Sequence, residues 1–261
     1  MSLKRQEASS LVDILERTPP IPPGSQWGMF LRNHDELTLE MVTAEERAYM
    51  YEQYAPDPAM KKNLGIRRRL APLLDGDRRR IELLDGLLLS LPGSPVFYYG
   101  DEIGMGDEYR LEDRDGVRTP MQWDGSPGVG FSTAPQDELY LPVVMAPGYT
   151  PTDVNVAAQR DNPDSLLTWV RQLLELRRSH PVFGVGSYKP VATSDPAVFA
   201  ILRRSPDETV LVVANVSERS VETNLDLPAT ATYTSVRGSR RIDEGTAGLA
   251  PYEFDWLCAE R

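Results

Sequence analysis

The chain has 261 residues, a formal net charge of −11 and a sequence pI of about 4.8. This acidity argues against nucleic acids and anionic membrane surfaces as partners, because both attract basic patches. No apolar run approaches the roughly 18 residues of a membrane span, and no secretory signal opens the chain. The single cysteine, Cys258, excludes an internal disulfide and is typical of a reducing compartment, so we expect a cytoplasmic protein.

The first part of the chain predicts a helix and then a buried strand. Apolar positions in residues 3–17 indicate an amphipathic helix, which the proline-rich residues 18–24 end. The apolar and aromatic run 26–31 indicates the strand. A β/α barrel places catalytic groups at the carboxyl ends of such strands. The polar residues that follow this strand are Asn33, His34, Asp35 and Glu36. They would either be catalytic groups of this kind or belong to an ordinary polar loop.

The middle of the chain predicts a βαβ unit. Thr43 and Glu46 have the spacing of a capping box and indicate a helix start. Residues 77–91 indicate an apolar helix and residues 94–100 a second buried strand, an order typical of parallel strands. The basic run 67–69 is expected to be a solvated face with ion pairs.

A long loop and a β domain complete the predicted fold. The loop, residues 101–161, is unusual for a compact domain, and such loops tend to be functional. A helix over 164–179 follows, with Pro163 in its first turn. From residue 183 the apolar pattern has period two, which indicates antiparallel strands. These are predicted at 197–204, 209–216 and 221–227, and less strongly at 233–236 and 254–257.

Three motifs resemble conserved regions of the alpha-amylase family. They are Gln26–Val42 with its Asn-His-Asp core, Tyr98–Gly106, and Asp113–Trp123 with Arg-Thr-Pro-Met-Gln-Trp. The resemblance implies an α/β plus all-β fold. Residues 1–182 would be the C-terminal part of a TIM (β/α)8 barrel with about two barrel strands, and residues 183–261 an antiparallel β-sandwich.

The resemblance also implies an activity and roles for site residues. The extended first motif is similar to the branch that interconverts maltose and trehalose by retaining glucosyl transfer. Oligo-1,6-glucosidases, alpha-glucosidases and sucrose isomerases share the third motif and stay as alternatives. Asp35 would be the third catalytic carboxylate, and His34 a hydrogen-bond donor in the transition state. The implied substrate-binding residues are Asn33, Glu36, Arg114, Arg118 and Gln122.

Several residues near the motifs leave two interpretations open. Glu36, Glu40, Arg114 and Arg118 would form an ion-paired gate, or would be solvated charges. Tyr98 and Tyr99 are expected to pack in the core rather than stack on sugar. Asp101 and Glu102, at the end of that strand, are better site candidates by position.

The retaining reaction needs a nucleophile and an acid, two carboxyl groups about 5–5.5 Å apart. The family carries both on earlier barrel strands, and no matching motif precedes Asp35. We therefore expect the chain to be inactive alone, as a truncated gene product, half of a split gene or a shortened chain. The alternative is a non-catalytic sugar-binding or partner module.

No metal site is predicted, because His34 and His180, the two histidines, share no ligand spacing. The resemblance allows calcium in the full-length family, with ligands outside this chain, so no cofactor is expected. The expected small-molecule partner is maltose or trehalose. A complementary N-terminal half, a second copy of the chain and a maltose kinase remain open as protein partners.

Overall fold

The computed structural model describes residues 1–228 and 230–260, which form two compact units. The first unit contains Met1–Met29, Glu82–Pro95 and the chain from Leu173 onward. The second contains Phe30–Ile81 and Val96–Gln172. No helix among the described residues is long and apolar enough to cross a membrane.

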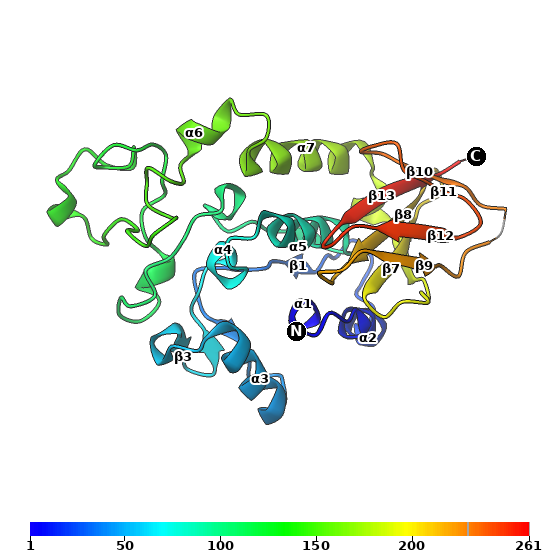
Figure 1. The fold of residues 1–261 in the computed structure, drawn as a ribbon, viewed down its shortest axis with the longest axis horizontal. Helices are drawn as coiled ribbons and strands as arrows, with labels where there is room; N and C mark the ends of the chain where they lie inside the picture. Colours follow the sequence, from blue (N-terminus) through cyan, green and yellow to red (C-terminus); the bar gives the residue numbers. More distant parts are fainter. Residues whose placement is uncertain (229, 261) are drawn as a thin grey trace. The chain divides into compact units, whose positions relative to one another are not determined.

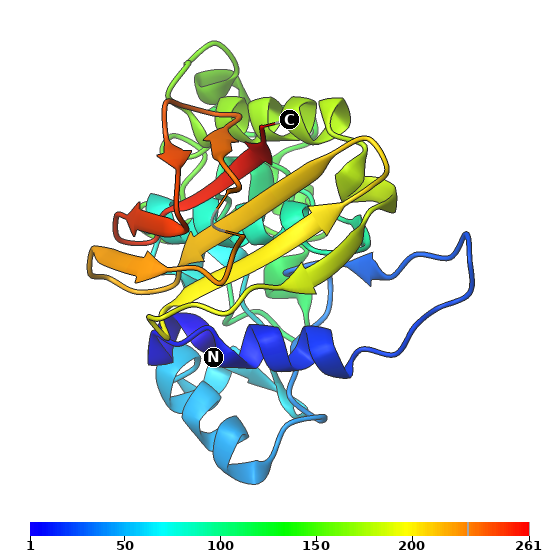
Figure 2. The ribbon, with the colours of Figure 1, turned by 90° about the vertical axis from the view of Figure 1, so that its right-hand side faces the viewer.

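The first unit is built on a six-stranded antiparallel sheet of order β11-β10-β13-β8-β7-β6, seen in Figures 1 and 2. Its strands are β6 (Ser187–Pro190), β7 (Val198–Arg204), β8 (Thr209–Asn215), β10 (Tyr233–Ser235), β11 (Arg241–Ile242) and β13 (Phe254–Ala259). A separate pair joins β9 (Val221–Asn224) and β12 (Thr246–Leu249). The predicted antiparallel strands are confirmed, whereas β6, β11 and β12 had not been predicted.

Apolar residues cover both faces of this sheet. On one face, Val213 of β8 and Leu249 of β12 belong to a single hydrophobic cluster, so the two sheets share a core. On the other face lies the part of α5 (Arg78–Ser90) that belongs to this unit. There the Trp256 indole donates to Ser90 Oγ at 2.6 Å. A Cβ on Gly86 would lie 2.5 Å from the Phe254 ring, so glycine permits this close approach.

The N-terminal helix is interrupted. The predicted helix over 3–17 is two helices, α1 (Ser2–Arg5) and α2 (Ser9–Arg17), because Gln6 has a left-handed φ of 55° and ends the first. The Tyr188 hydroxyl of β6 donates to the Leu15 carbonyl at 2.9 Å, which holds α2 beside the sheet (Figure 2). The short helix α8 (Val182–Val185) precedes β6.

A short parallel pair joins β1 (Gly28–Met29) and β5 (Ser94–Pro95). Both lie inside the strands predicted at 26–31 and 94–100, but each is only two residues long. Pro95 has no N–H to donate, so the ladder does not extend past it.

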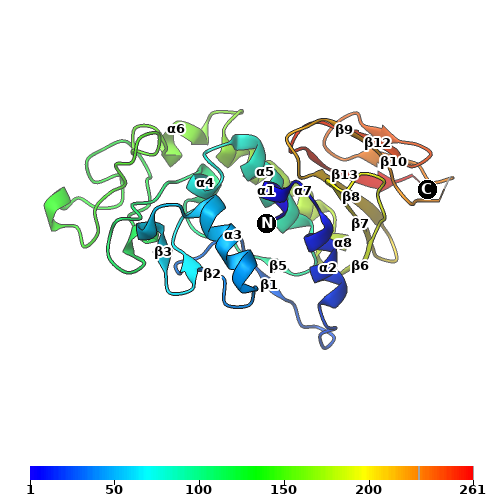
Figure 3. The same ribbon diagram turned by 60° about the horizontal axis from the view of Figure 1, so that its bottom comes forward.

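The second unit begins with the predicted capping box. Thr43 Oγ1 accepts from the Glu46 N–H at 3.2 Å, and the Thr43 N–H donates to Glu46 Oε2 at 3.0 Å, which starts α3 (Ala44–Tyr54). The Lys61 ammonium lies 4.5 Å from the Tyr51 ring centroid and joins α3 to a small sheet. Figure 3 shows α3 beside this sheet. That sheet has the order β2-β4-β3, with strands β2 (Leu37–Thr38), β3 (Lys61–Lys62) and β4 (Gly65–Ile66).

The remaining elements are short. Ser165 Oγ accepts from the Thr168 N–H at 3.1 Å and caps α7 (Leu166–Ser179), which begins two residues after the predicted start at 164. The segment 101–161 contains short helical turns and a hydrophobic cluster that includes Met105 and Val144. The other helices are η1 (Pro58–Met60), α4 (Leu70–Leu73), η2 (Asp101–Ile103), η3 (Asp115–Val117), η4 (Gln136–Glu138) and α6 (Val156–Arg160).

Candidate functional site

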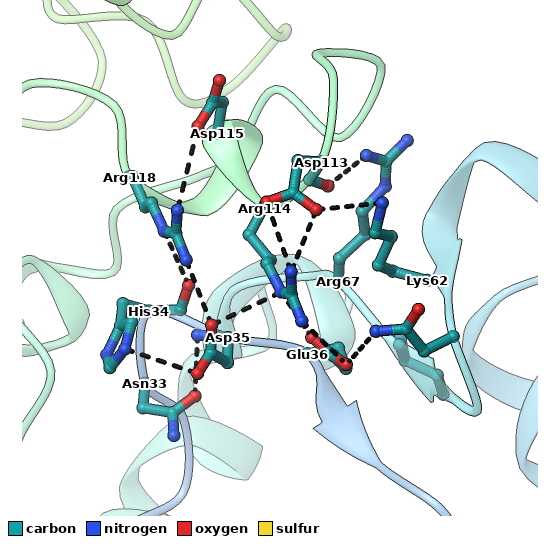
Figure 4. A network of polar contacts seen from close by, with 12 residues as sticks. Asn33, His34, Asp35, Glu36, Lys62, Arg67, Asp113, Arg114, Asp115 and Arg118 are labelled. Atoms are coloured by element: carbon teal, nitrogen blue, oxygen red, sulfur yellow. Dashed lines mark hydrogen bonds and ion pairs between the residues drawn. The ribbon is translucent and has the colours of Figure 1, made fainter.

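Asp35 lies in a tight turn in the second unit (Figure 4). The Asn33 side-chain oxygen accepts from the Asp35 N–H at 2.9 Å and fixes this turn. His34 Nε2 lies 3.3 Å from Asp35 Oδ2, and both side chains are exposed, by 63% and 43%. The turn therefore presents an imidazole and a carboxylate together to solvent.

Two arginines hold the other carboxylate oxygen of Asp35 (Figure 4). Arg118 Nη2 donates to Asp35 Oδ1 at 3.1 Å, and Arg118 Nε donates to the His34 carbonyl at 3.0 Å. Arg114 Nε lies 3.4 Å from the same Oδ1. The two arginines flank the single turn of η3, which aims both guanidinium groups at one carboxylate.

Glu36 extends the cluster. Arg114 Nε donates to Glu36 Oε2 at 2.8 Å, and Asn63 Nδ2 donates to Glu36 Oε1 at 2.7 Å. Burial alone would raise the pKa of Glu36, but the hydrogen bonds from Arg114 and Asn63 outweigh it and hold the pKa below its usual value. Glu36 is therefore an acceptor for charged and neutral donors at once.

Asp113 forms the outer end of the cluster. Lys62 Nζ lies 2.9 Å from Asp113 Oδ1, and Arg114 Nη1 lies 3.0 Å from the same oxygen. The hydrogen bond from Lys62, followed by that from Arg114, lowers the pKa of Asp113 to about 2. Arg114 is thus shared by three carboxylates.

The structure brings most of the predicted site residues together, with two exceptions. Gln122 is buried, and its amide donates to the Tyr149 carbonyl at 3.2 Å and to the Val154 carbonyl. This position braces the loop, and substrate contact by Gln122 stays a prediction. Glu40 is exposed and lies outside the ion-paired network of the described residues. The residues brought together are Asn33, His34, Asp35, Glu36, Arg114 and Arg118.

A buried arginine positions the turn from behind. Arg32 is only 3% exposed. Its Nη2 donates to the Asp35 carbonyl at 3.0 Å and to the Ile66 carbonyl at 3.3 Å, and its Nε donates to the Arg68 carbonyl at 2.6 Å. Burial lowers the pKa of Arg32 to about 10. Sequence reasoning missed this residue, although it directly precedes the Asn-His-Asp core.

The basic run 67–69 is not a solvated face, which corrects the sequence prediction. Arg69 is 1% exposed, and its guanidinium lies 4.7 Å and 4.5 Å from the ring centroids of Tyr98 and Tyr99. A planar, weakly hydrated guanidinium can be buried in this way, stacked on aromatic faces. Asp101 Oδ1 is 3.7 Å away, and burial raises the pKa of Asp101 to about 7. Tyr98 is half-buried beside Arg69, whereas Tyr99 is exposed on its other side, so the expected core packing does not hold for Tyr99.

An apolar pocket of about 470 Å³ adjoins Arg118. Aromatic side chains dominate its wall, and Trp123 and Tyr140 are 47% and 93% exposed. Aromatic rings beside a charged donor provide both stacking and hydrogen bonding, a combination suited to small polar ligands with apolar faces. The aromatic residues lining it are Tyr99, Trp123, Phe131 and Tyr140.

The chain matches two domain families in succession. Residues 67–186 match the alpha amylase catalytic domain, and residues 188–256 match the maltogenic amylase C-terminal domain. An isomaltulose synthase from Erwinia rhapontici NX5 has a similar fold, with a TM-score of 0.66 and 21% identity over 98% of this chain and 47% of that one. The chain thus resembles part of the alpha amylase catalytic domain, followed by the C-terminal domain of maltogenic amylases.

The chain is also a homologue of trehalose synthases. It is 53% identical to the trehalose synthase/amylase of Mycobacterium tuberculosis over 97% of its own length and 42% of the relative. It is 30% identical to the oligo-1,6-glucosidase of Bacillus cereus over 59% of its length and 32% of the relative. The chain therefore spans less than half the length of the relatives it matches.

Proposed function

We propose that this chain carries the Asp35 part of the active site of an enzyme that interconverts maltose and trehalose. The observation that carries the proposal is the Asp35 carboxylate, held by His34, Arg114 and Arg118 in a chain 53% identical to a trehalose synthase/amylase. The lower identity to an oligo-1,6-glucosidase, 30%, supports this substrate pair over the alternatives.

The chemistry assigns separate roles to these groups. Glycosyl transfer with retention passes through an oxocarbenium-like transition state, whose developing positive charge favours a preorganised carboxylate. In this proposal, Asp35 accepts hydrogen bonds from sugar hydroxyls, and His34 donates to one of them. Asn33 fixes the turn, and Arg32 donates a hydrogen bond to the Asp35 backbone carbonyl.

Arg118 is proposed as a gate and acceptor-site residue. Its contact with Asp35 is part-exposed, and such ion pairs contribute only about 0–1 kcal/mol, so a sugar can replace one partner at small cost. Arg118 also lines the aromatic pocket, where a released glucose would be retained. Arg114 and Glu36 support the arrangement from the side, and Gln122 holds the loop.

The proposal includes a barrel and a sandwich as the architectures of the two domains. We take β1 and β5 as neighbouring barrel strands and the two C-terminal sheets as a sandwich. The proposed domain division is 1–182 and 183–261, which is supported by the change of matched family between residues 186 and 188. A cytoplasmic location and a disaccharide substrate go with this assignment.

A chimera tests the proposal. The aligned portion of the M. tuberculosis relative is replaced by this chain, and the purified chimera is incubated with maltose. We expect trehalose as a product by chromatography. Glucose as the only product would contradict the maltose–trehalose assignment and leave a glucosidase. The control is the unmodified relative under the same conditions.

A second candidate is sugar binding without turnover, which the pocket lined by Trp123 and Tyr140 favours. The 261-residue chain alone separates it from the first. We expect no turnover of maltose, trehalose or a nitrophenyl glucoside, because no motif in the chain provides the nucleophile and acid pair. Turnover that disappears in Asp35→Ala would contradict this expectation.

A further inference from the structure

Three potential metal ligands meet at one end of the first unit, and the sugar site does not use them. Cys258 lies on β13, opposite Val210 of β8. Glu208 lies in the turn between β7 and β8, where the Ser205 N–H donates to the Glu208 carbonyl at 2.8 Å. His180 directly follows α7. Long-range folding thus joins three residues whose sequence spacing indicates no metal motif.

Their ligand atoms already lie close together. Cys258 Sγ is 3.9 Å from His180 Nδ1 and 3.7 Å from Glu208 Oε1, and His180 Nδ1 is hydrogen-bonded to Glu208 Oε1. All three ligand atoms lie within 4.8 Å of one another. The side chains of His180 and Glu208 are 17% and 21% exposed, so the cluster is partly shielded but reachable.

We propose that His180, Glu208 and Cys258 form a binding site for a divalent transition metal, best suited to Zn²⁺. Zinc–sulfur bonds of about 2.3 Å and zinc–nitrogen or –oxygen bonds of about 2.0–2.2 Å place tetrahedral ligand atoms roughly 3.4–3.6 Å apart. The two sulfur distances, 3.7 and 3.9 Å, are close to that spacing. The imidazole and carboxylate must move apart, and the metal then replaces both the proton they share and the thiol proton of Cys258, which are released to solvent.

The ligand types decide which cation fits. A thiolate with one imidazole and one carboxylate disfavours Ca²⁺ and Mg²⁺, which prefer oxygen ligands, and favours Zn²⁺ or Co²⁺. A pocket of about 500 Å³ borders Glu208 and Cys258 and leaves room for water as a fourth ligand. The bound ion would join the end of α7, the β7–β8 turn and strand β13.

The composition of the chain makes the test specific. Cys258 is the single cysteine, so a cobalt–thiolate charge-transfer band can arise from no other residue of this chain. The reduced 261-residue chain is titrated with Co²⁺ alone. We expect one equivalent to produce the band and Zn²⁺ to abolish it by displacement. Absence of the band at saturating Co²⁺, with Cys258 still reactive to a thiol reagent, would overturn the proposal.

Variants assign the ligands. His180→Ala and Glu208→Gln should each weaken Co²⁺ binding at least about tenfold, the lower bound for loss of a supporting group. His34→Ala removes the other histidine and is the matched control, in which the band should be unchanged. We expect Zn²⁺ to raise the melting temperature of the parent chain, whereas in Cys258→Ala the band and this stabilisation should both be lost. Equal Zn²⁺ stabilisation of Cys258→Ala and the parent would overturn the proposal.

Discussion

Two groups of charged residues in the second unit form the same kind of ion pair in opposite environments. In the outer group, the side chains of Asp35 and Arg118 are 43% and 35% exposed, whereas Asp101 and Arg69 of the inner group are at most 4% exposed. The pKa of Asp113 in the outer group is lowered by its partners, whereas burial raises the pKa of Asp101. Hydrogen bonds and ion pairs therefore determine the pKa shift in the outer group, whereas loss of hydration determines it in the inner group.

This difference separates two tasks. The outer pairs are inexpensive to open, so a ligand can replace a partner. The inner pairs are costly to break once one partner is removed, so they fix the geometry. Arg32 links the groups, because its buried guanidinium interacts electrostatically with Asp101 and also donates to the Asp35 carbonyl at 3.0 Å.

The largest effect should come from Arg69→Met. The change removes the Arg69 cation beside Asp101, leaves only the weaker influence of Arg32, and removes the bond to the Tyr99 carbonyl at 2.7 Å. We expect the free energy of unfolding at pH 8 to fall by about 3–5 kcal/mol. Urea unfolding followed by circular dichroism measures it. A loss below about 1 kcal/mol would mean that the inner group is not structural.

Asp101 should make stability depend on pH. Its folded pKa is about 7 against an ordinary value of 3.8, so the folded state holds this proton more tightly. The resulting stabilisation is fully present below pH 4 and is lost as pH rises through 7. The stability of the parent relative to Asp101→Asn should therefore fall by a few kcal/mol, roughly 1.4 per unit of pKa shift, between pH 4 and pH 8. A constant difference over this range would contradict the assignment.

Arg118→Met sharpens the contrast from the outer side. Its pairs are part-exposed, so the free energy of unfolding should change by no more than about 1 kcal/mol. In the chimera, however, kcat/KM for maltose should fall about tenfold, equivalent to ~1.4 kcal/mol. Parallel unfolding and kinetic measurements compare the two. A large loss of stability without a kinetic effect would assign Arg118 to the scaffold.

Asp113→Asn should have the smallest effect. The folded pKa of Asp113, about 2, is below its ordinary value of 3.8. The stabilisation it contributes is present above pH 4 and is lost as pH falls toward 2, the opposite of Asp101. Melting temperatures of the variant and the parent should therefore converge in acid. If the difference in melting temperature between the variant and the parent grew as pH falls, the lowered pKa assigned to Asp113 would be contradicted.

Sequence reasoning reached the outer group but not the inner one, for a physical reason. Asn33 to Glu36 are contiguous polar residues after an apolar run, so their exposure and proximity are visible in the pattern. The sequence around Arg69 does not distinguish a buried arginine from a solvated one. Only the fold brings its guanidinium against the rings of Tyr98 and Tyr99. The helix capped by Thr43 was predicted from local signals, whereas the length of β1 depends on pairing with Ser94 and Pro95.

The cluster of His180, Glu208 and Cys258 escaped prediction for the same reason. Its members lie far apart in the chain, and antiparallel pairing of β7, β8 and β13 brings two of them to one end of the sheet. Sequence spacing identifies metal ligands only when they share a local motif.

The central claim is that Asp35 stabilises the transition state of maltose–trehalose interconversion. Asp35→Asn in the chimera tests it most directly, with Asp113→Asn as the matched carboxylate control from the same ion-paired cluster. We expect kcat to fall by about 10³-fold for Asp35→Asn, the size of effect seen when a preorganised group is lost. The control should stay within a few-fold of the parent chimera. A loss of less than tenfold for Asp35→Asn, or equal losses for both variants, would contradict the account.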